Sequence, residues 1–460
     1  MTGLTRASLQ AYAKRVRPAY ERWLKRLVEI PSVSSDPGHA GDCARVADAA
    51  AELVESLGGR AQVEKTGGHP LLVGEFAGPK GSPTITLYNH LDVQPADREA
   101  EGWRTEPFRF TMKDGRYWGR GTTDDKGPAL AALFGAAAAR EADVPVTVKL
   151  LWETEEEIGS PHFERALRRL GRRVATDAVV ISDGSWLTRK RPTVAAGLRG
   201  FKGFRFTLET GEGDVHSGIA GGAVRNALGE LMDLACALHD PRTGRVKVPG
   251  FYDGIVKPTR KERADFRDSG FTVARFKKDN HARRLRTEDP LEVMERLWTR
   301  PTFEVHGLTG GHQGPGHKSI VPTRAELKAS CRLVPGQDPD RIASLVVAFA
   351  KKHNRDIVAE VTLGGAAASV WRPTGPLAAA VKSAVRFAFG ATPAFVRDGG
   401  SVGTVLTMEE VLRCPVGFLD LSMPDHGYHA PNENFEWGQA AGGMAAFARL
   451  AQEWGGVSIH

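Results

Sequence analysis

The alternation of short apolar segments with helix-periodic segments over residues 9–182 constrains the fold most strongly. The apolar runs have strand length, and we expect strands at Ala61–Glu64, Leu71–Phe76, Thr84–Tyr88, Val146–Trp152 and Ala178–Ser182. Apolar residues spaced three and four apart predict helices at Leu9–Leu27, Asp42–Leu57, Pro128–Arg140 and Pro161–Leu170. Strands and helices that alternate in this way indicate an α/β sheet covered by helices.

A different pattern begins after Gly197. We expect strands and helices at Phe201–Glu209, Gly222–Leu238, Ala325–Val334, Arg341–His353 and Ile357–Leu363, around an Arg- and Lys-rich stretch from Asp240 to Arg300. This is the order of a small α+β sandwich with one strand not identified. After Trp371 the first pattern resumes, with helices at Pro376–Phe389 and Gln439–Glu453. The sequence therefore predicts an α/β domain in two parts, 1–197 and 374–460, and an inserted domain, 198–373.

Composition excludes several classes of protein. The chain has 460 residues, 41% of them hydrophobic and 25% charged, with a net charge of +7, which excludes a disordered chain. No basic tract is dense enough to predict nucleic-acid binding. Met1–Ile30 lacks the apolar core of a secretory signal, and no run approaches the roughly 18 apolar residues of a membrane span. The four cysteines are far apart and indicate neither disulfides nor a cysteine zinc site. We expect a cytoplasmic protein without membrane or nucleic-acid partners.

Polar residues that can bind a metal follow the predicted strands. The segments in question are Asn89–Asp92, Gly119–Gly127, Glu153–Glu157, Asp183, and His429 near the C-terminus. Each segment alone is weak evidence for a metal site, but the strand ends of an open α/β sheet meet at one edge. Together they would place uncompensated negative charge in one crevice, which a pair of divalent cations would offset. Imidazole and carboxylate ligands suit zinc, manganese or cobalt.

Two neighbouring carboxylates suggest roles beside such a metal pair. Glu156 lies next to Glu157 and can act as a general base on a water molecule. Asp92 lies two residues after His90 and can orient its imidazole.

These segments resemble motifs of the M20 family of metallopeptidases, most closely its cytosolic non-specific dipeptidase (carnosine dipeptidase) group. The similarity spans nearly the whole chain in family order. It lies in His90–Pro95, Gly119–Gly127, Glu155–Ser160, Ile181–Asp183, Val215–Gly218 with Gly221-Gly222, and Arg332–Pro335. The resemblance implies a zinc-peptidase-like catalytic domain with a mixed sheet, and an inserted α+β domain that serves as lid and dimerisation domain.

The resemblance also implies a role for each matching residue. His90 and Asp183 would ligate one metal, Glu157 and His429 the other, and Asp124 would bridge both. Glu156 would be the general base. His216 would reach the active site of the other subunit of a homodimer and stabilise the oxyanion. Arg332 would bind the substrate's free carboxylate, and Gly400-Ser401 would belong to a substrate-contact loop.

Two of these assignments involve a choice between neighbours. The acidic run Glu155–Glu157 has one glutamate more than the motif needs, and the Ile-Gly-Ser that follows favours Glu156 as base and Glu157 as ligand. His426 and His429 both lie near the C-terminal motif, and the Pro431-Asn-Glu433 that follows favours His429. The basic insertion Lys257–Arg286 matches none of the motifs.

The most concrete functional hypothesis is a dinuclear metal-dependent hydrolase. It would cleave dipeptides or short peptides with a free C-terminal carboxylate, by general-base activation of a metal-bridging water. Zinc would be the metal, with manganese or cobalt as alternatives. An amidohydrolase acting on N-acyl amino acids would use the same site with a different pocket. A metal-binding protein without catalysis would lack a ligand or the base, and none is missing here.

Overall fold

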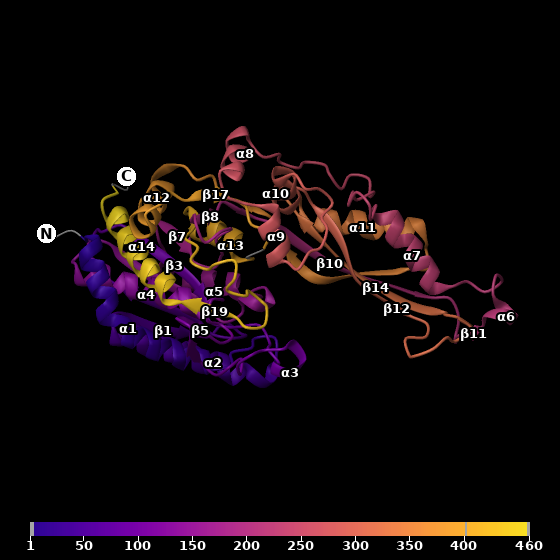
Figure 1. Cartoon of the computed structure of the whole chain (residues 1–460), viewed down its shortest axis with the longest axis horizontal. Coiled ribbons are helices and arrows are strands. Elements are labelled where there is room, and N and C mark those ends of the chain that lie inside the picture. The colour runs from indigo at the N-terminus through magenta and orange to yellow at the C-terminus, as the bar shows by residue number, and fades with distance from the viewer. Residues whose placement is uncertain (1–3, 401–402, 458–460) are drawn as a thin grey trace.

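The computed structural model describes residues 4–400 and 403–457, which form a broad lobe and a narrower lobe extending from it (Figure 1). In that part of the chain the sheet of the broad lobe has six strands in the order β1-β2-β6-β3-β7-β18. Their bounds are Arg60–Glu64, Leu71–Phe76, Thr147–Glu153, Thr84–His90, Ala178–Ile181 and Val416–Phe418. Strands β6, β3, β7 and β18 pair in parallel, whereas β1 and β2 are antiparallel. The sheet is therefore mixed, and the predicted α/β fold is confirmed.

The central strands are apolar because helices cover both faces of this sheet. All four residues of β7 are buried, which predicts cover on both sides. The helices of the broad lobe are α1 (Arg6–Val28), α2 (Ala40–Ser56), α3 (Arg98–Glu101), α4 (Lys126–Glu141), α5 (Phe163–Leu170), α12 (Gly375–Phe389), α13 (Thr404–Leu412) and α14 (Trp437–Gly455). Tyr88 of β3 packs edge-on against Phe163 of α5, while α4 packs on β3 and on α14.

Small residues let α4 and α14 approach closely. Every residue of α4 from Lys126 to Ala139 is buried, and half of them are alanine. At Gly135 an added Cβ would lie 2.6 Å from the Cβ of Phe447 and 2.8 Å from the carbonyl oxygen of Met444. This contact joins the first and last parts of the chain in one hydrophobic core.

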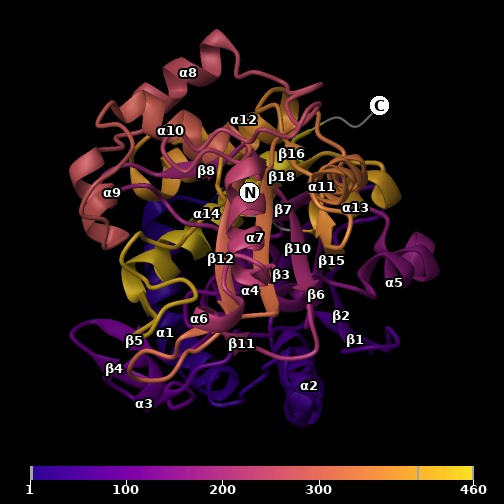
Figure 2. The same cartoon turned by 90° about the vertical axis from the view of Figure 1, so that its right-hand side faces the viewer.

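The narrow lobe has its own sheet and core (Figure 2). Its sheet order is β12-β14-β10-β15, all antiparallel, with bounds Thr302–Gly310, Arg324–Leu333, Gly200–Glu209 and Val358–Ala366. Helices α7 (Ala227–Leu238) and α11 (Pro339–His353) pack on it. Strand β12 is the strand of the α+β sandwich that the sequence pattern did not identify. At the tip lie β11 (Val215–His216), β13 (Ile320–Val321) and α6 (Ser217–Ala220).

Other elements were misplaced or missed by the sequence analysis. Helix α7 begins at Ala227 rather than Gly222, because the Asn226 side chain caps it by accepting from the amide of Gly229. The polar stretch contains α8 (Arg260–Arg267), α9 (Val273–Asp279) and α10 (Pro290–Trp298). Helix α8 packs on β17 (Ala394–Val396), which pairs with β8 (Thr193–Ala195) beside the broad lobe.

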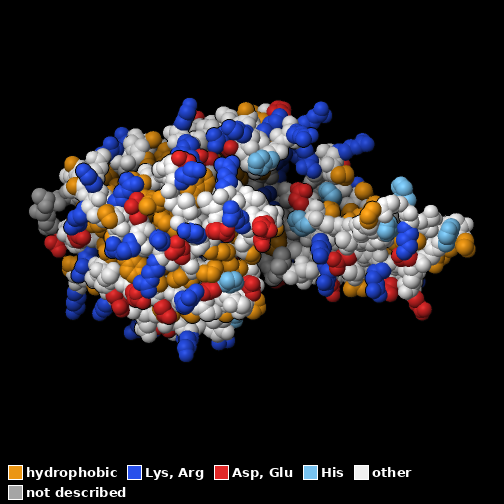
Figure 3. Space-filling view, turned by 60° about the horizontal axis from the view of Figure 1, so that its bottom comes forward, with side chains coloured by type: hydrophobic (Ala, Val, Ile, Leu, Met, Phe, Trp, Pro, Cys, Tyr) orange, Lys and Arg blue, Asp and Glu red, His pale blue; other side chains and the backbone are white. Residues whose placement is uncertain are grey.

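Short strands complete the described chain. They are β4 (Thr111–Lys113), β5 (Arg116–Trp118), β9 (Gly197–Leu198), β16 (Ser369–Val370) and β19 (Asn434–Glu436). Acidic and basic side chains are interspersed on the face shown in Figure 3. None of the helices within 4–400 and 403–457 has the length and apolar character that crossing a membrane requires.

The close packing of α4 on α14 predicts that Gly135→Ala lowers the melting temperature by at least about 2 °C, because a methyl group has no room there. Differential scanning calorimetry measures the shift. Gly438→Ala is the matched control, since nothing lies within 4 Å of an added Cβ at this position of α14. That control should leave the melting temperature unchanged or raise it. Equal behaviour of the two variants would contradict the packing argument.

Candidate metal centre

The two histidines and three carboxylates predicted as ligands lie together at the ends of the central strands. His90 is the last residue of β3, Asp183 follows β7, and Glu157 follows β6. Asp124 precedes α4, and His429 comes from the loop before β19. Parallel strands bring their carboxyl ends to one edge of the sheet, which explains why residues far apart in sequence meet there.

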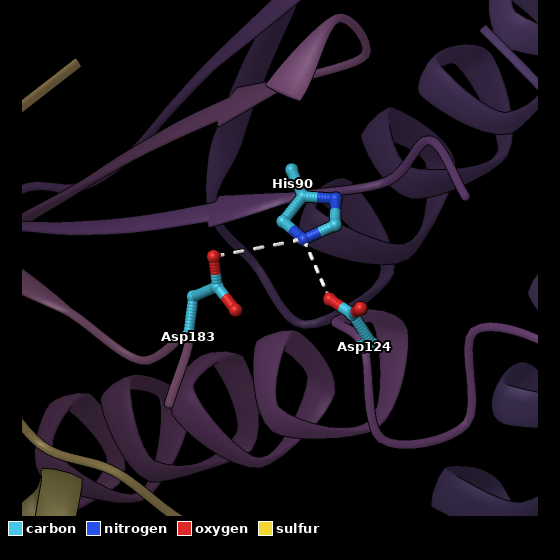
Figure 4. Close-up of side chains that lie close together, drawn as sticks. All are labelled: His90, Asp124 and Asp183. Carbon is cyan, nitrogen blue, oxygen red and sulfur yellow. Dashed lines mark hydrogen bonds and ion pairs between the residues drawn. The ribbon is translucent and has the colours of Figure 1, made fainter. Parts of the chain in front are cut away.

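Asp124 stands between the two histidines. Its Oδ1 lies 3.0 Å from Nε2 of His90, and its Oδ2 lies 3.0 Å from Nε2 of His429. A second carboxylate completes each side: Asp183 lies 3.8 Å from His90, and Glu157 lies 3.1 Å from His429. Figure 4 shows the His90 ring facing both Asp124 and Asp183. The donor atoms of each trio lie within 4.8 Å of one another, so each trio fits one metal ion, with Asp124 common to both.

The pKa values in the centre depart strongly from their ordinary values, because charged groups lie close together and His90 and Asp124 are buried. Although burial opposes it, hydrogen bonds from His429 and His90 lower the pKa of Asp124. Hydrogen bonds to Asp124 and Glu157 raise the pKa of His429 to about 11. Burial raises the pKa of Asp183 to about 7. Asp124 thus stays ionised between two histidines that hold protons, and a divalent cation would displace those protons.

Asp92 and Glu156 adjoin the cluster. Nδ1 of His90 lies 3.0 Å from the backbone oxygen of Asp92 and 3.5 Å from its carboxylate. The Asp92 carboxylate also accepts from the amides of Glu156 and Glu157, at 3.2 and 3.0 Å. Burial, together with the charges of Asp183 and Glu157, raises the pKa of the Glu156 carboxyl well above its ordinary value. Asp92 therefore ties the β3 end to the acidic turn.

The neighbours considered as alternatives lie elsewhere. Glu155 points away from the cluster and accepts from the amide of His69 at 2.9 Å, and it also contacts the His162 ring. His426 is fully buried, accepts from the amide of Met423 at 3.0 Å and packs against Phe435. Both residues are engaged in the support of the loops around the cluster.

The remaining predicted residues are not in the cluster. His216 ends β11 at the tip of the narrow lobe, exposed and away from β3 (Figure 1). Arg332 lies on β14, where its guanidinium stacks 5.0 Å from the ring centre of Phe201, and burial lowers its pKa. Gly400 donates its amide to Asp398, at 2.7 Å, and accepts from the amide of Arg199. Ser401 lies outside the described residues.

Glu433, which the sequence does not single out, joins the loop of His429 to the loop of Asp124. The carboxylate of Glu433, four residues after His429, is fully buried. It accepts from the amides of Gly121, Thr123 and Asp124, at 3.0, 2.8 and 3.0 Å. It also accepts from the buried Arg120 at 2.9 Å. In the sequence, the Pro431-Asn-Glu433 motif distinguishes His429 from His426, but nothing in it shows that Glu433 lies against the Gly-rich loop.

Two further buried groups support the Asp124 loop. Lys126 donates to the carbonyls of Leu27 and Ile30, at 2.9 and 3.0 Å, and so fixes the start of α4 to the end of α1. Asp125 accepts from the side chain of Asn89 at 2.7 Å. These contacts hold the loop without using the carboxylate of Asp124, which stays directed at the histidines.

Comparison with known proteins places this chain in a family. The pattern of Peptidase family M20/M25/M40 matches residues 86–453. The chain belongs to the M20 family.

Relatives and solved structures agree over nearly the full length of this M20 peptidase. It is 30% identical over 455 residues to the Cys-Gly metallodipeptidase dug1 of Schizosaccharomyces pombe, covering 95% of each chain. It is 30% identical to human Beta-Ala-His dipeptidase, covering 93% of this chain and 88% of the relative. The structure of the di-peptidase Dug1p from Saccharomyces cerevisiae matches with a TM-score of 0.87 at 28% identity, over 98% of both chains. The protein is thus a metallopeptidase-type hydrolase, and its family implies a divalent metal at the donor cluster.

The Glu433 contacts predict that Glu433→Gln destabilises the M20 peptidase by about 3–5 kcal/mol, because the variant leaves the buried Arg120 without a counter-charge. Urea unfolding followed by circular dichroism measures the change. Glu410→Gln is the control, since Glu410 pairs with Arg168 on the surface, and surface pairs contribute little. A Glu433 variant as stable as the Glu410 variant would show that the buried pair does not support the loop.

Proposed function

We propose that the chain is a dinuclear metal-dependent dipeptidase that cleaves the amide bond of dipeptides or short peptides with a free C-terminal carboxylate. The arrangement of Asp124 carries this proposal, because each of its oxygens faces a different histidine. The names of its relatives, a Cys-Gly metallodipeptidase and a Beta-Ala-His dipeptidase, support the choice of dipeptides.

The proposal assigns the ligands in two sets. His90 and Asp183 would hold one ion, Glu157 and His429 the other, and Asp124 both. Two divalent ions there, zinc or else manganese or cobalt, would act as Lewis acids on the amide carbonyl and lower the pKa of a bound water. Asp92 would keep the His90 ring oriented from its Nδ1 side.

Glu156 would move the proton in this scheme. Its carboxyl is buried beside His90 and Asp183, and its raised pKa suits a group that takes a proton from water and returns it to the leaving amine. The Asp92 carboxylate positions Glu156 by accepting a hydrogen bond from its backbone amide, at 3.2 Å. The neighbouring Glu155 is occupied by His162 and His69 and would have no such role.

Substrate binding would involve the narrow lobe. Arg332 offers a planar guanidinium that can form two hydrogen bonds with a carboxylate. The loop of Gly400 and Ser401 would line the same end of the substrate. Residues 198–373 would form the lid and dimerisation domain. Because His216 lies at the tip of the narrow lobe, it would stabilise the oxyanion in the partner subunit of a homodimer.

Metal removal and replacement tests the activity. The purified chain is stripped of metal, supplied with zinc, manganese or cobalt, and assayed for amine release. Free dipeptides, the same dipeptides with an amidated C-terminus, and N-acyl amino acids form the substrate set. We expect metal-dependent release from free dipeptides and at least about tenfold lower kcat/KM for the amides, which lack the carboxylate. Release from N-acyl amino acids alone would instead identify an amidohydrolase.

The role of Glu156 predicts that Glu156→Gln lowers kcat by about 10²–10⁴-fold while the bound metal is retained. Metal content is measured by inductively coupled plasma mass spectrometry on the same samples. Glu155→Gln is the matched control in the adjacent position and should keep most of the activity, since Gln can still accept from His69. If only the Glu155 variant lost most of its activity, Glu155 rather than Glu156 would be the general base.

A further inference from the structure

A large cavity lined by residues 243–304 lies apart from the metal centre. Its volume is about 840 Å³, and none of its lining residues belongs to the ligand cluster. Its lining residues come from α8, α10, the start of β12 and the segments before these helices, and α8 and α10 are labelled in the upper middle of Figure 1. Cavities of this size hold small molecules. The neighbouring basic insertion is the sequence segment that the M20 motifs do not explain.

The cavity is lined by an excess of positive charge. Two lining residues, Glu295 and Glu304, are acidic. The basic residues of the lining are Arg245, Lys257, Arg263, Arg286, Arg296 and Arg300. Lys and Arg side chains also crowd the upper edge of the molecule where the two lobes meet (Figure 3).

Carboxylates offset only part of this charge. Glu295 pairs with Arg263 at 2.7 Å and with Arg300 at 3.3 Å. Glu292 of α10 pairs with Arg296 at 2.9 Å. Within residues 4–400 and 403–457, no carboxylate forms an ion pair with the three remaining cations, Arg245, Lys257 and Arg286. The side chains of these three are therefore available to an external anion.

Hydrogen bonds to backbone carbonyls hold two of the lining arginines in place. Arg286 and Arg296 donate to the carbonyls of Pro241 and Thr243, at 3.3 and 3.1 Å. That turn is closed by Asp240, whose carboxylate accepts from the amide of Arg242 at 2.9 Å. Gly244 has a φ of +74°, and an added Cβ would lie 3.5 Å from the guanidinium carbon of Arg286. The glycine thus leaves the guanidinium face uncovered, and the hydrogen bonds to the turn hold Arg286 and Arg296 in place before any ligand arrives.

We propose that this cavity is a binding site for a small multivalent anion that carries two or more phosphate or carboxylate groups. Guanidinium groups match both kinds of anion because they present paired N–H donors in one plane. Several charges on one small ligand would be needed to offset cations that stand on different walls, from Arg245 before α8 to Arg286 before α10. None of the lining residues belongs to the donor cluster, although Thr302 of the lining pairs with Arg332 in the neighbouring strand β14.

Isothermal titration calorimetry on the metal-loaded full chain tests the proposal. Fructose 1,6-bisphosphate and tricarballylate are the phosphate and carboxylate probes, each titrated at constant ionic strength. We expect saturable binding of one anion per chain for at least one probe, and the probe that binds identifies the anion chemistry. Absence of saturable binding for both would overturn the proposal.

A charge-matched pair of variants separates a site from general attraction. Arg245→Gln with Lys257→Gln removes two exposed cations of the cavity that have no partner to lose. Lys351→Gln with Lys352→Gln removes two exposed cations from the last turn of α11, outside the cavity. We expect the first double variant to weaken binding by at least about tenfold and the second to stay within about twofold. Equal weakening by both would assign the effect to net charge and refute the site.

Discussion

The mutual repulsion of carboxylates in a buried place is the constraint on which this structure depends. Six carboxyl groups converge near the ends of β3, β6 and β7: Asp92, Asp124, Asp125, Glu156, Glu157 and Asp183. Burial, together with the negative charge of neighbouring carboxylates, raises the pKa of Asp125 and of Glu156 well above their ordinary values. A fold that keeps such groups together needs cations at the centre and rigid loops around it. The Asp92, Glu433 and Lys126 contacts are those supports, and each uses backbone groups rather than the Asp124 oxygens that face the histidines.

Much of the broad lobe could be predicted from the sequence because its strands are short apolar runs with clear ends. The expected strand Leu71–Phe76 matches β2 at both ends, and β3 and β6 extend just far enough to include His90 and Glu153. The five expected ligands then meet because parallel strands end at one edge. The local order of residues was enough to find the candidate segments, whereas the choice of Asp124, Glu157 and His429 within them came from the resemblance to the M20 motifs.

Other features depend on contacts that a linear pattern does not contain. Strand β12 has an exposed, mixed face, and its pairing with β14 defines it. Helices α8 and α10 have N-capping residues, Thr259 and Asp289, that are visible in the sequence. The polar residues around these helices nevertheless give no clear helical pattern of apolar residues. The role of Glu433 requires the C-terminal loop to lie on the Gly-rich loop more than 300 residues earlier. His216 shows the same limit, since no spacing reveals how far the tip of the narrow lobe stands from β3.

The bond between Glu433 and the Asp124 loop also orders events in time. Until residue 433 has been synthesised, the amides of Gly121, Thr123 and Asp124 lack their acceptor, and His429 has not yet reached Asp124. A nascent chain on the ribosome therefore carries the acidic half of the centre without its last imidazole. Completion of the centre is postponed until synthesis has passed residue 433, so hydrolytic competence would arise only after this late segment has folded onto the Asp124 loop.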